Sequence, residues 1–284
     1  MTNRISMLHC RKFPYKIVHS DNDRELQTAF FAKNNHAYEL NVLEDMSERL
    51  QKDDLFLDVG ANIGNHTLYI AALGINVVAF EANPLVADML NDSIKLNGFE
   101  SRITLHRVGI GAIHSKAKLI TGSLNNLGGW RLRLLMDDEV IDKDKDIVEV
   151  LPLDDINFKQ RVKVIKIDVE HMEYDVLKGA NQLIVRDKPL IYLECHNAEE
   201  MRPIISLLES YDYYYHSSFN HFTHFFIPRD SSSPTDRDIL HRLQYQLFYL
   251  HYASCLDMRR VSNLLNSLDE KITKIQEQLK KCNE

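Results

Sequence analysis

A glycine-bracketed turn between two apolar runs constrains the fold of this chain more than any other feature. Residues 55–59 (LFLDV) are apolar enough for a short strand that is buried on both faces of a parallel sheet. Gly60 and Gly64 then enclose a tight turn, where glycine permits a sharp bend and the close approach of a ligand. An apolar helix is expected over 67–73 and a second strand over 76–81. This order of elements predicts a β-α-β unit.

Two carboxylates stand near the ends of these strands. Asp58 precedes the turn, and Glu81 follows the second strand. In β-α-β units that bind nucleotides, a carboxylate about 20 residues beyond the turn binds the hydroxyls of a ribose. The start of the helix behind the turn also presents free backbone N–H groups. We therefore expect a nucleotide-like cofactor at this turn.

The spacing of the glycines argues against a dinucleotide. A dinucleotide-binding turn has the pattern G-x-G-x-x-G, because the pyrophosphate lies on the backbone of the second glycine. Here the glycines are spaced G-x-x-x-G, and Asn62 stands where the second glycine would be. Asp58 would repel a pyrophosphate but suits a cationic, amino-acid-like group. An NAD-dependent dehydrogenase is therefore disfavoured.

The turn resembles the D-x-G-x-x-x-G loop of S-adenosylmethionine-dependent methyltransferases, and the string DVGANIGNHT (58–67) resembles the FkbM family in particular. A second stretch, IDVEHMEYDVLKG (167–179), is similar to the family signature I-D-x-E-G-x-E-x-x-V-L-x-G. It departs from that signature at His171, where the family usually has glycine. If the position requires a positive φ, the imidazole is placed at the rim of a pocket, whereas in an ordinary turn it points outward. The resemblance covers about residues 30–228.

The resemblance implies an α/β fold, namely the Rossmann-like, seven-stranded class I methyltransferase fold with strand order 3-2-1-4-5-7-6. It also implies S-adenosylmethionine as the cofactor. The residues expected to bind this cofactor are Asp58, Gly60, Ala61, Asn62, Gly64, Glu81, Ala82 and Gly109.

The chain divides into a small N-terminal lead-in (1–54), a methyltransferase domain (55–229) and a C-terminal helical extension (235–284). The lead-in is expected to hold a short strand at 15–18 and helices at 25–33 and 39–50. From Leu55 onward, strands and helices alternate as in a doubly wound domain. The later elements are expected as a helix at 84–97, strands at 103–108, 162–168 and 190–194, helices at 173–179 and 201–208, and a closing antiparallel pair at 213–215 and 222–227.

Residues 112–150 do not predict a crossover helix. Strand-like patterns at 116–121 and 147–151 flank a turn that contains Trp130 and a charged loop at 137–146. The resemblance to FkbM proteins implies the same arrangement. We expect this insert to overhang the pocket and to influence the choice of acceptor.

The C-terminal region predicts two helices behind a linker at 231–234. Apolar residues recur at spacings of three and four in two series, at 240–250 and at 261–279, which do not share one register. Such a seam favours self-association or docking to a partner helix. A helix folded back on the catalytic domain is the alternative.

Acidic residues and a histidine end the fourth and fifth strands, where ligands of open α/β sheets bind. Asp168, Glu170 and His196 are the candidates for the base that takes a proton from the acceptor. In a second interpretation, Asp168, Glu170 and Glu194 supply oxygen ligands to Mg²⁺. The sequence leaves both interpretations open.

The charge and the cysteines exclude several classes. A net charge of −7 disfavours nucleic acid as a partner. The four cysteines are far apart, which indicates a reducing compartment without a disulfide framework or structural zinc. No stretch predicts a secretory signal or a membrane span, so a cytoplasmic protein is expected.

The family resemblance implies an O-methyltransferase that acts on a sugar hydroxyl of a glycan or polysaccharide, or on a small natural product. Two alternatives remain. One is a protein or nucleic-acid methyltransferase, and the other is a catalytically silent scaffold that binds a partner through its C-terminal helices. The intact loop carboxylates and glycines speak against the scaffold.

Overall fold

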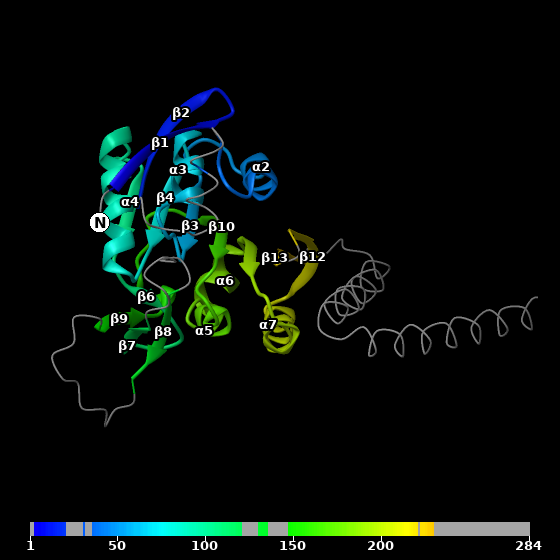
Figure 1. Ribbon diagram of the computed structural model, residues 1–284. Helices are drawn as coiled ribbons and strands as arrows, with labels where there is room; N and C mark the ends of the chain where they lie inside the picture. The colour runs from blue at the N-terminus through cyan, green and yellow to red at the C-terminus, as the bar shows by residue number, and fades with distance from the viewer. Residues whose placement is uncertain are drawn as a thin grey trace, which may run out of the picture. The chain divides into compact units, whose positions relative to one another are not determined.

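The computed structural model describes residues 3–20, 31, 36–120, 130–135, 147–220 and 222–229 (Figure 1). Apart from Asn197–Glu199, these residues belong to one compact unit. The predicted linker at 231–234, the two C-terminal helices, the charged loop at 137–146 and nearly all of the helix at 25–33 lie outside the described residues. None of the described helices is long and apolar enough to cross a membrane.

A seven-stranded sheet forms the centre of this unit, in the order β12-β13-β11-β10-β3-β4-β5. Its strands are β3 (Leu55–Val59), β4 (Asn76–Phe80), β5 (Ile103–His106), β10 (Val162–Ile167), β11 (Leu190–Glu194), β12 (Tyr213–Phe219) and β13 (Thr223–Pro228). Only β13 pairs antiparallel, with β11 and β12. The predicted strand order is confirmed. The neighbouring strands β3 and β10 continue to β4 and β11, which lie on opposite sides of them, and this reversal of strand order is where open α/β sheets bind ligands, beyond the carboxyl ends of the strands.

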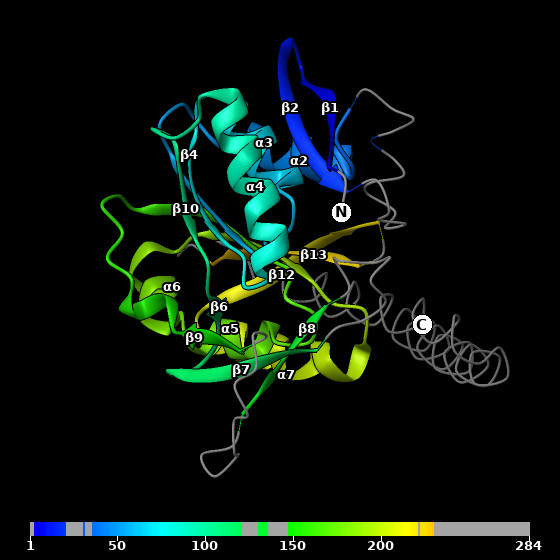
Figure 2. The same ribbon diagram turned by 60° about the vertical axis from the view of Figure 1, so that its left-hand side comes forward.

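Helices cover both faces of the sheet. The views in Figures 1 and 2 place α2 (Leu40–Glu48), α3 (Asn65–Ala72) and α4 (Pro84–Asn97) on one side, and α5 (Glu173–Lys178) and α6 (Asn181–Asp187) on the other. Helix α7 (Ala198–Ser210) connects β11 to β12. As the sequence predicts, α4 begins at a proline and ends at Gly98, which adopts the left-handed conformation with φ 66°.

Two parts of the fold differ from the sequence prediction. The lead-in contains a complete hairpin of β1 (Asn3–Cys10) and β2 (Phe13–Ser20), which packs on α3 and α4, although only a strand at 15–18 is expected. Most of β1 is exposed, so its sequence lacks the apolar alternation that identifies a strand. The third strand is also shorter than predicted, because the chain leaves the central sheet after His106.

The chain then builds a second, four-stranded sheet in the order β6-β9-β7-β8. Its strands are β6 (Gly109–Ile110), β7 (Ser115–Ile120), β8 (Arg131–Leu134) and β9 (Ile147–Leu151), and a 3₁₀ turn, η1 (Leu153–Asp155), follows. The prediction of strands in place of a crossover helix is confirmed for the described part of 112–150. This sheet brings the insert to the carboxyl end of β10.

Candidate active site

The turn after β3 packs directly on the chain that leaves β10. The backbone N–H groups of Gly60 and Ala61 both donate to the carbonyl oxygen of Phe80, at 3.0 Å each. Gly60 has φ 81°, and a Cβ built on it would lie 1.7 Å from the carbonyl oxygen of Asp168. Only glycine fits between these backbones. The turn therefore holds the carboxyl ends of β3 and β10 in contact.

Replacing Gly60 with alanine is expected to lower the free energy of unfolding by about 3 kcal/mol, because the added methyl group collides with backbone rather than with a movable side chain. Gly98 is the matched control. It also has a positive φ, but a Cβ there would meet nothing within 4 Å, so Gly98→Ala should cost only about 1 kcal/mol. Urea unfolding of both variants measures the difference, and equal losses would contradict the contact with Asp168.

Glu81 fixes the rest of the turn through both of its carboxylate oxygens. Its Oε2 accepts from the backbone N–H of Asn62 at 2.8 Å, and its Oε1 accepts from the backbone N–H of Asn83 at 2.7 Å. Asn62 takes the left-handed conformation with φ 51°, which asparagine tolerates better than most residues. Burial raises the pKa of Glu81 to about 7, although the two N–H groups act in the opposite direction. A half-buried carboxylate thus stands at the mouth of the crevice.

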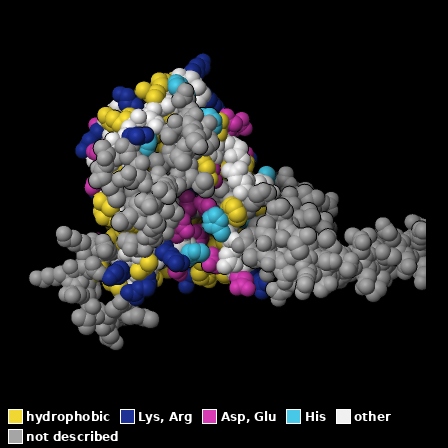
Figure 3. All heavy atoms as spheres, viewed as in Figure 1, with side chains coloured by type: hydrophobic (Ala, Val, Ile, Leu, Met, Phe, Trp, Pro, Cys, Tyr) yellow, Lys and Arg dark blue, Asp and Glu magenta, His cyan; other side chains and the backbone are white. Residues whose placement is uncertain are grey.

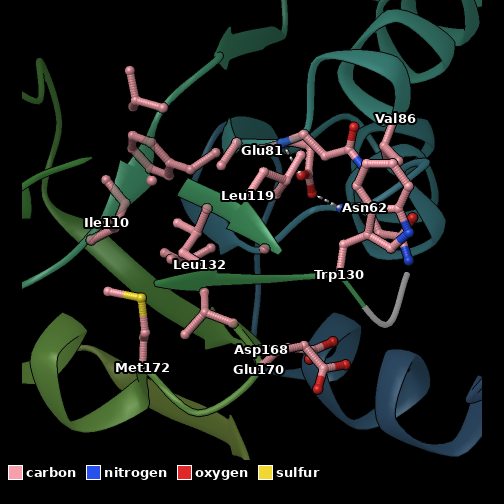
Figure 4. Close-up of a pocket in the computed structure, with 18 residues that line it drawn as sticks. Asn62, Glu81, Val86, Ile110, Leu119, Trp130, Leu132, Asp168, Glu170 and Met172 are labelled. Carbon is pink, nitrogen blue, oxygen red and sulfur yellow. Dashed lines mark hydrogen bonds between the residues drawn. The ribbon is translucent and has the colours of Figure 1, made fainter. Parts of the chain in front are cut away.

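A pocket of about 670 Å³, counted with the space that opens to solvent, lies at this position (Figure 4). Of the predicted cofactor-binding residues, Gly60, Asn62, Glu81, Ala82 and Gly109 line it. The remaining lining residues are Val59, Phe80, Asn83, Val86, Val108, Ile110, Leu119, Trp130, Leu132, Asp168, Val169, Glu170 and Met172.

Three predicted cofactor residues, Asp58, Ala61 and Gly64, do not line the pocket. The carboxylate of Asp58 is fully buried, accepts from Thr67 Oγ1 at 2.6 Å, and lies 3.5 Å from Lys166 Nζ. The cation beside Asp58 in this structure is a lysine of the chain itself. A role of Asp58 in binding the cofactor stays a prediction.

Lys166 is a site residue that sequence reasoning missed. Its ammonium is buried in β10 and donates to Asp168 Oδ2 at 3.0 Å and to the carbonyl oxygen of Gly60 at 3.1 Å. A signal was present, since a lysine within a strand that is buried on both faces requires buried anions beside it. Asp58 and Asp168 are those anions.

A second, smaller pocket of about 240 Å³, again counted with the space that opens to solvent, shares two residues with the first, Asp168 and Glu170. The other residues that line it are His171, Glu173, Glu194, Cys195, His196 and Glu200. Figure 3 shows a hollow in which acidic side chains gather beside histidines. The predicted catalytic residues Asp168, Glu170 and His196 are thus brought together around one pocket.

Charge coupling orders the protons in this second pocket. Although burial opposes ionisation, the adjacent Lys166 ammonium lowers the pKa of Asp168. Burial and the negative charge of Asp168 raise the pKa of Glu194 to about 7, and protonated Glu194 donates to Asp168. His196 Nε2 lies 2.8 Å from Glu194 Oε1, and this hydrogen bond raises the pKa of His196. Lys166, Asp168, Glu194 and His196 thus form a row of coupled ionisable groups that runs from the core to the pocket.

Glu170 and His171 adopt strained backbone conformations, with φ 51° and 78°. The signature position where the family usually has glycine therefore does require a positive φ in this chain. The imidazole of His171 lines the second pocket and lies 3.0 Å from a carboxylate oxygen of Glu200. Consecutive left-handed residues are costly, and such strain concentrates at functional sites.

The predicted magnesium ligands do not form a metal site. In the described part of the chain, no group of three or more His, Cys, Asp or Glu side chains is placed to hold a metal ion. Lys166 contacts Asp168, and Glu194 is bonded to His196, so the carboxylates have partners within the protein. The geometry gives magnesium no support.

The larger pocket suits a nucleoside-bearing cofactor. Among the described residues, two buried N–H donors on its wall have no partner, Asn83 Nδ2 and Trp130 Nε1. Apolar side chains of the second sheet, Leu119 and Leu132, supply another wall. Unpaired buried donors are costly unless a ligand satisfies them. S-adenosylmethionine offers the ring nitrogens and hydroxyl oxygens that such donors need.

Comparison with known proteins gives one family. A family model described as the methyltransferase FkbM domain matches residues 58–215, more than half of the chain. The hexuronic acid methyltransferase AglP of Haloferax volcanii is 25% identical over 180 residues, which cover 60% of this chain and 67% of that protein.

Two solved structures are also similar. The methyltransferase FkbM of Methylobacillus flagellatus has a TM-score of 0.42 and 17% identity, over 71% of this chain and 65% of that one. The tRNA (uracil-54, C5)-methyltransferase of Pyrococcus abyssi, in complex with S-adenosyl-L-homocysteine, has a TM-score of 0.44 and 14% identity, over 78% of this chain and 43% of that one.

Proposed function

Because the chain belongs to the FkbM family of methyltransferases, we propose that it transfers a methyl group from S-adenosylmethionine to a sugar hydroxyl. One observation carries the proposal: the two pockets adjoin at Asp168 and Glu170. The larger pocket receives the methyl donor and the smaller one receives the acceptor. Methyl transfer is an in-line displacement, so two sites that meet at one wall are what the reaction requires.

The residues of the larger pocket bind and orient the donor. S-adenosylmethionine, when bound, supplies a methyl group on a positively charged sulfur. Glu81 accepts from the ribose hydroxyls, while its two bonds to the backbone hold it in place. Gly60 and Asp168 both line this pocket, so a cofactor bound there lies beside the glycine turn and beside Asp168.

His196 is the base in this proposal. Its Nε2 is held by Glu194, so the ring is oriented and its Nδ1 is left to accept the proton of the acceptor hydroxyl. Its side chain is 49% exposed, which gives an acceptor access to it. The negative charge of Asp168 raises the pKa of Glu194 and so favours its protonated form. Glu170 lines both pockets and completes the wall between them. A nucleophile, an oriented base and an anchored donor are the parts that the reaction needs.

The charge of the smaller pocket favours a neutral sugar. Among the described residues, its lining includes five carboxylates, two histidines and the thiol of Cys195, and no lysine or arginine. The Haloferax relative is named for hexuronic acid, which is an anion, whereas a carboxylate acceptor would meet like charges here. We therefore place neutral sugar hydroxyls before uronic acids.

Two measurements test the proposal together. Isothermal titration with S-adenosylhomocysteine should give heat with a single site, and neutral glycans should gain a methyl group from S-adenosylmethionine faster than uronic acids. Methylation of protein or RNA but not sugar would overturn the acceptor. An absence of binding heat would overturn the cofactor and support a catalytically silent scaffold.

The rate should depend on pH through His196. Only its neutral imidazole accepts a proton, and the hydrogen bond that its Nε2–H donates to Glu194, together with the nearby charges of Glu170 and Asp168, raises the pKa of His196 from its ordinary value. Because this pKa is raised, kcat/KM should still be rising at about pH 7. Glu194→Gln removes the main cause, so the acidic limb of its pH–rate profile should move to lower pH while the maximal rate falls. A limb at the wild-type pH would contradict the assignment.

A further inference from the structure

We propose that Asn83 and Trp130 bind the nucleoside half of the methyl donor, which makes the second sheet part of the cofactor site. The inference rests on the proposed function and extends it to two residues that the sequence pattern does not identify. It stands on two buried donors, on their place in the pocket and on the strands that carry them.

Asn83 presents a donor whose orientation is settled by the fold. It is the N-cap of α4, and its side-chain Oδ1 accepts from the backbone N–H of Leu85 at 3.1 Å. Because the cap needs the oxygen, the amide nitrogen must be the other end. Asn83 is only 3% exposed, and Nδ2 has no partner among the described residues. A buried amide N–H₂ group on a pocket wall requires an acceptor from a ligand.

Trp130 presents a second donor from a different part of the fold. It lies immediately before β8, and its Nε1 is buried without a partner in the described part of the chain. A residue that follows Trp130 in β8 also lies at the pocket. Leu132 of β8 pairs with Leu119 of β7, and both line the pocket beside Trp130.

The two donors lie on the same side of the pocket as Glu81, the carboxylate that is proposed to bind the ribose. The backbone N–H of Asn83 donates to Glu81, so the amide is two residues from the group that binds the ribose. Figure 4 shows the indole near Asn62 and Val86, and away from the carboxylates of Asp168 and Glu170. A purine offers ring nitrogens as acceptors and a flat face for an indole. The methionine half has a carboxylate that accepts hydrogen bonds but no flat face, so the place of the two donors beside Glu81 and the indole face favour the nucleoside half.

The assignment gives the insert a role in binding the donor as well as in shaping the acceptor site. Leu119 of β7 and Leu132 of β8 line the pocket together with Trp130 (Figure 4). Binding of the donor would then hold the insert in place, since the indole of Trp130 gains a hydrogen bond that the described residues do not supply.

Because Trp130 is the only tryptophan of the chain, its fluorescence reports on this contact alone. Titration with S-adenosylhomocysteine should change the emission in a saturable way, with a midpoint equal to the dissociation constant from calorimetry. Adenosine should cause the same kind of change, and methionine should cause none. A response to methionine and not to adenosine would overturn the assignment to the nucleoside half.

Two substitutions test the donors without relying on activity. Trp130→Phe keeps an aromatic face and removes the N–H, while Asn83→Ser keeps a good N-cap and removes the amide. Each should weaken S-adenosylhomocysteine binding about tenfold in calorimetry, the effect of one lost hydrogen bond in a buried site. Leu134→Val on β8 and Asn91→Ser on α4, both outside the pocket lining, are the matched controls and should bind as the wild type does.

The outcomes separate this inference from the function on which it rests. If the wild type binds S-adenosylhomocysteine, but its emission does not change or both variants bind normally, the inference fails and the methyltransferase proposal stands. If the wild type gives no heat at all, the cofactor itself is wrong and both fail. Thermal unfolding of the two variants near the wild-type temperature excludes a general loss of structure.

Discussion

Replacing Asp168 with asparagine is expected to lower kcat by at least about 100-fold while the affinity for S-adenosylhomocysteine changes less than about threefold. Asp168 lines both pockets, and its negative charge lies between the Lys166 ammonium and Glu194. Without that charge, the pKa of Glu194 falls, and the pKa of His196 loses the contribution of Asp168. Asparagine keeps the shape of the side chain and can still accept from Lys166.

Single-turnover methyl transfer and calorimetry on the same preparation measure this split between rate and binding. Asp92→Asn on α4 removes an exposed carboxylate far from the pocket lining and is the control for a general change in charge. A variant at Asp168 that kept more than about one third of the wild-type kcat would show that the junction of the two pockets is not where the chemistry occurs.

Replacing Glu81 has the second large effect, this time on binding. Hydrogen bonds to a charged group contribute about 1.5–3 kcal/mol, so Glu81→Gln should weaken S-adenosylhomocysteine binding by roughly 10- to 150-fold. Glu81→Ala should weaken it further, because the backbone N–H groups of Asn62 and Asn83 then lose their acceptor and the turn loses its shape.

Calorimetry again supplies the measurement, and Glu100→Gln, an exposed glutamate in the turn after α4, is the matched control. At saturating donor, Glu81→Gln should recover most of the wild-type kcat, because Glu81 binds the ribose and not the acceptor. Unchanged affinity in both Glu81 variants would mean that the ribose lies elsewhere.

Much of the site could be predicted from local sequence because each part depends on neighbours along the chain. The turn at Gly60, the ends of β3 and β11 and the C-cap of α4 are local features, and these occur where the pattern indicates. The sequence left open whether position 171 needs a positive φ, and only the backbone of the structure shows that His171 adopts one.

Other residues could not be placed because their surroundings come from distant segments. Asp58 looks like a ligand-binding carboxylate until β10 brings Lys166 beside it, from more than 100 positions away. Trp130 is an isolated aromatic residue in the sequence, and only the pairing of β7 with β8 turns its strand toward the pocket. The exposed strand β1 gave no periodic signal at all.

The sequence by itself determined the glycine turn and the succession of strands and helices, since these follow from periodicity and from short spacings, and its resemblance to a known family supplied the family and the strand order of the central sheet. The tertiary structure decided which charges meet. A buried lysine balances two carboxylates, two pockets join at Asp168 and Glu170, and two buried donors without a partner among the described residues lie on the wall of the larger pocket. Those facts depend on close contacts between strands that lie far apart in the chain, and no local pattern encodes the distance between them.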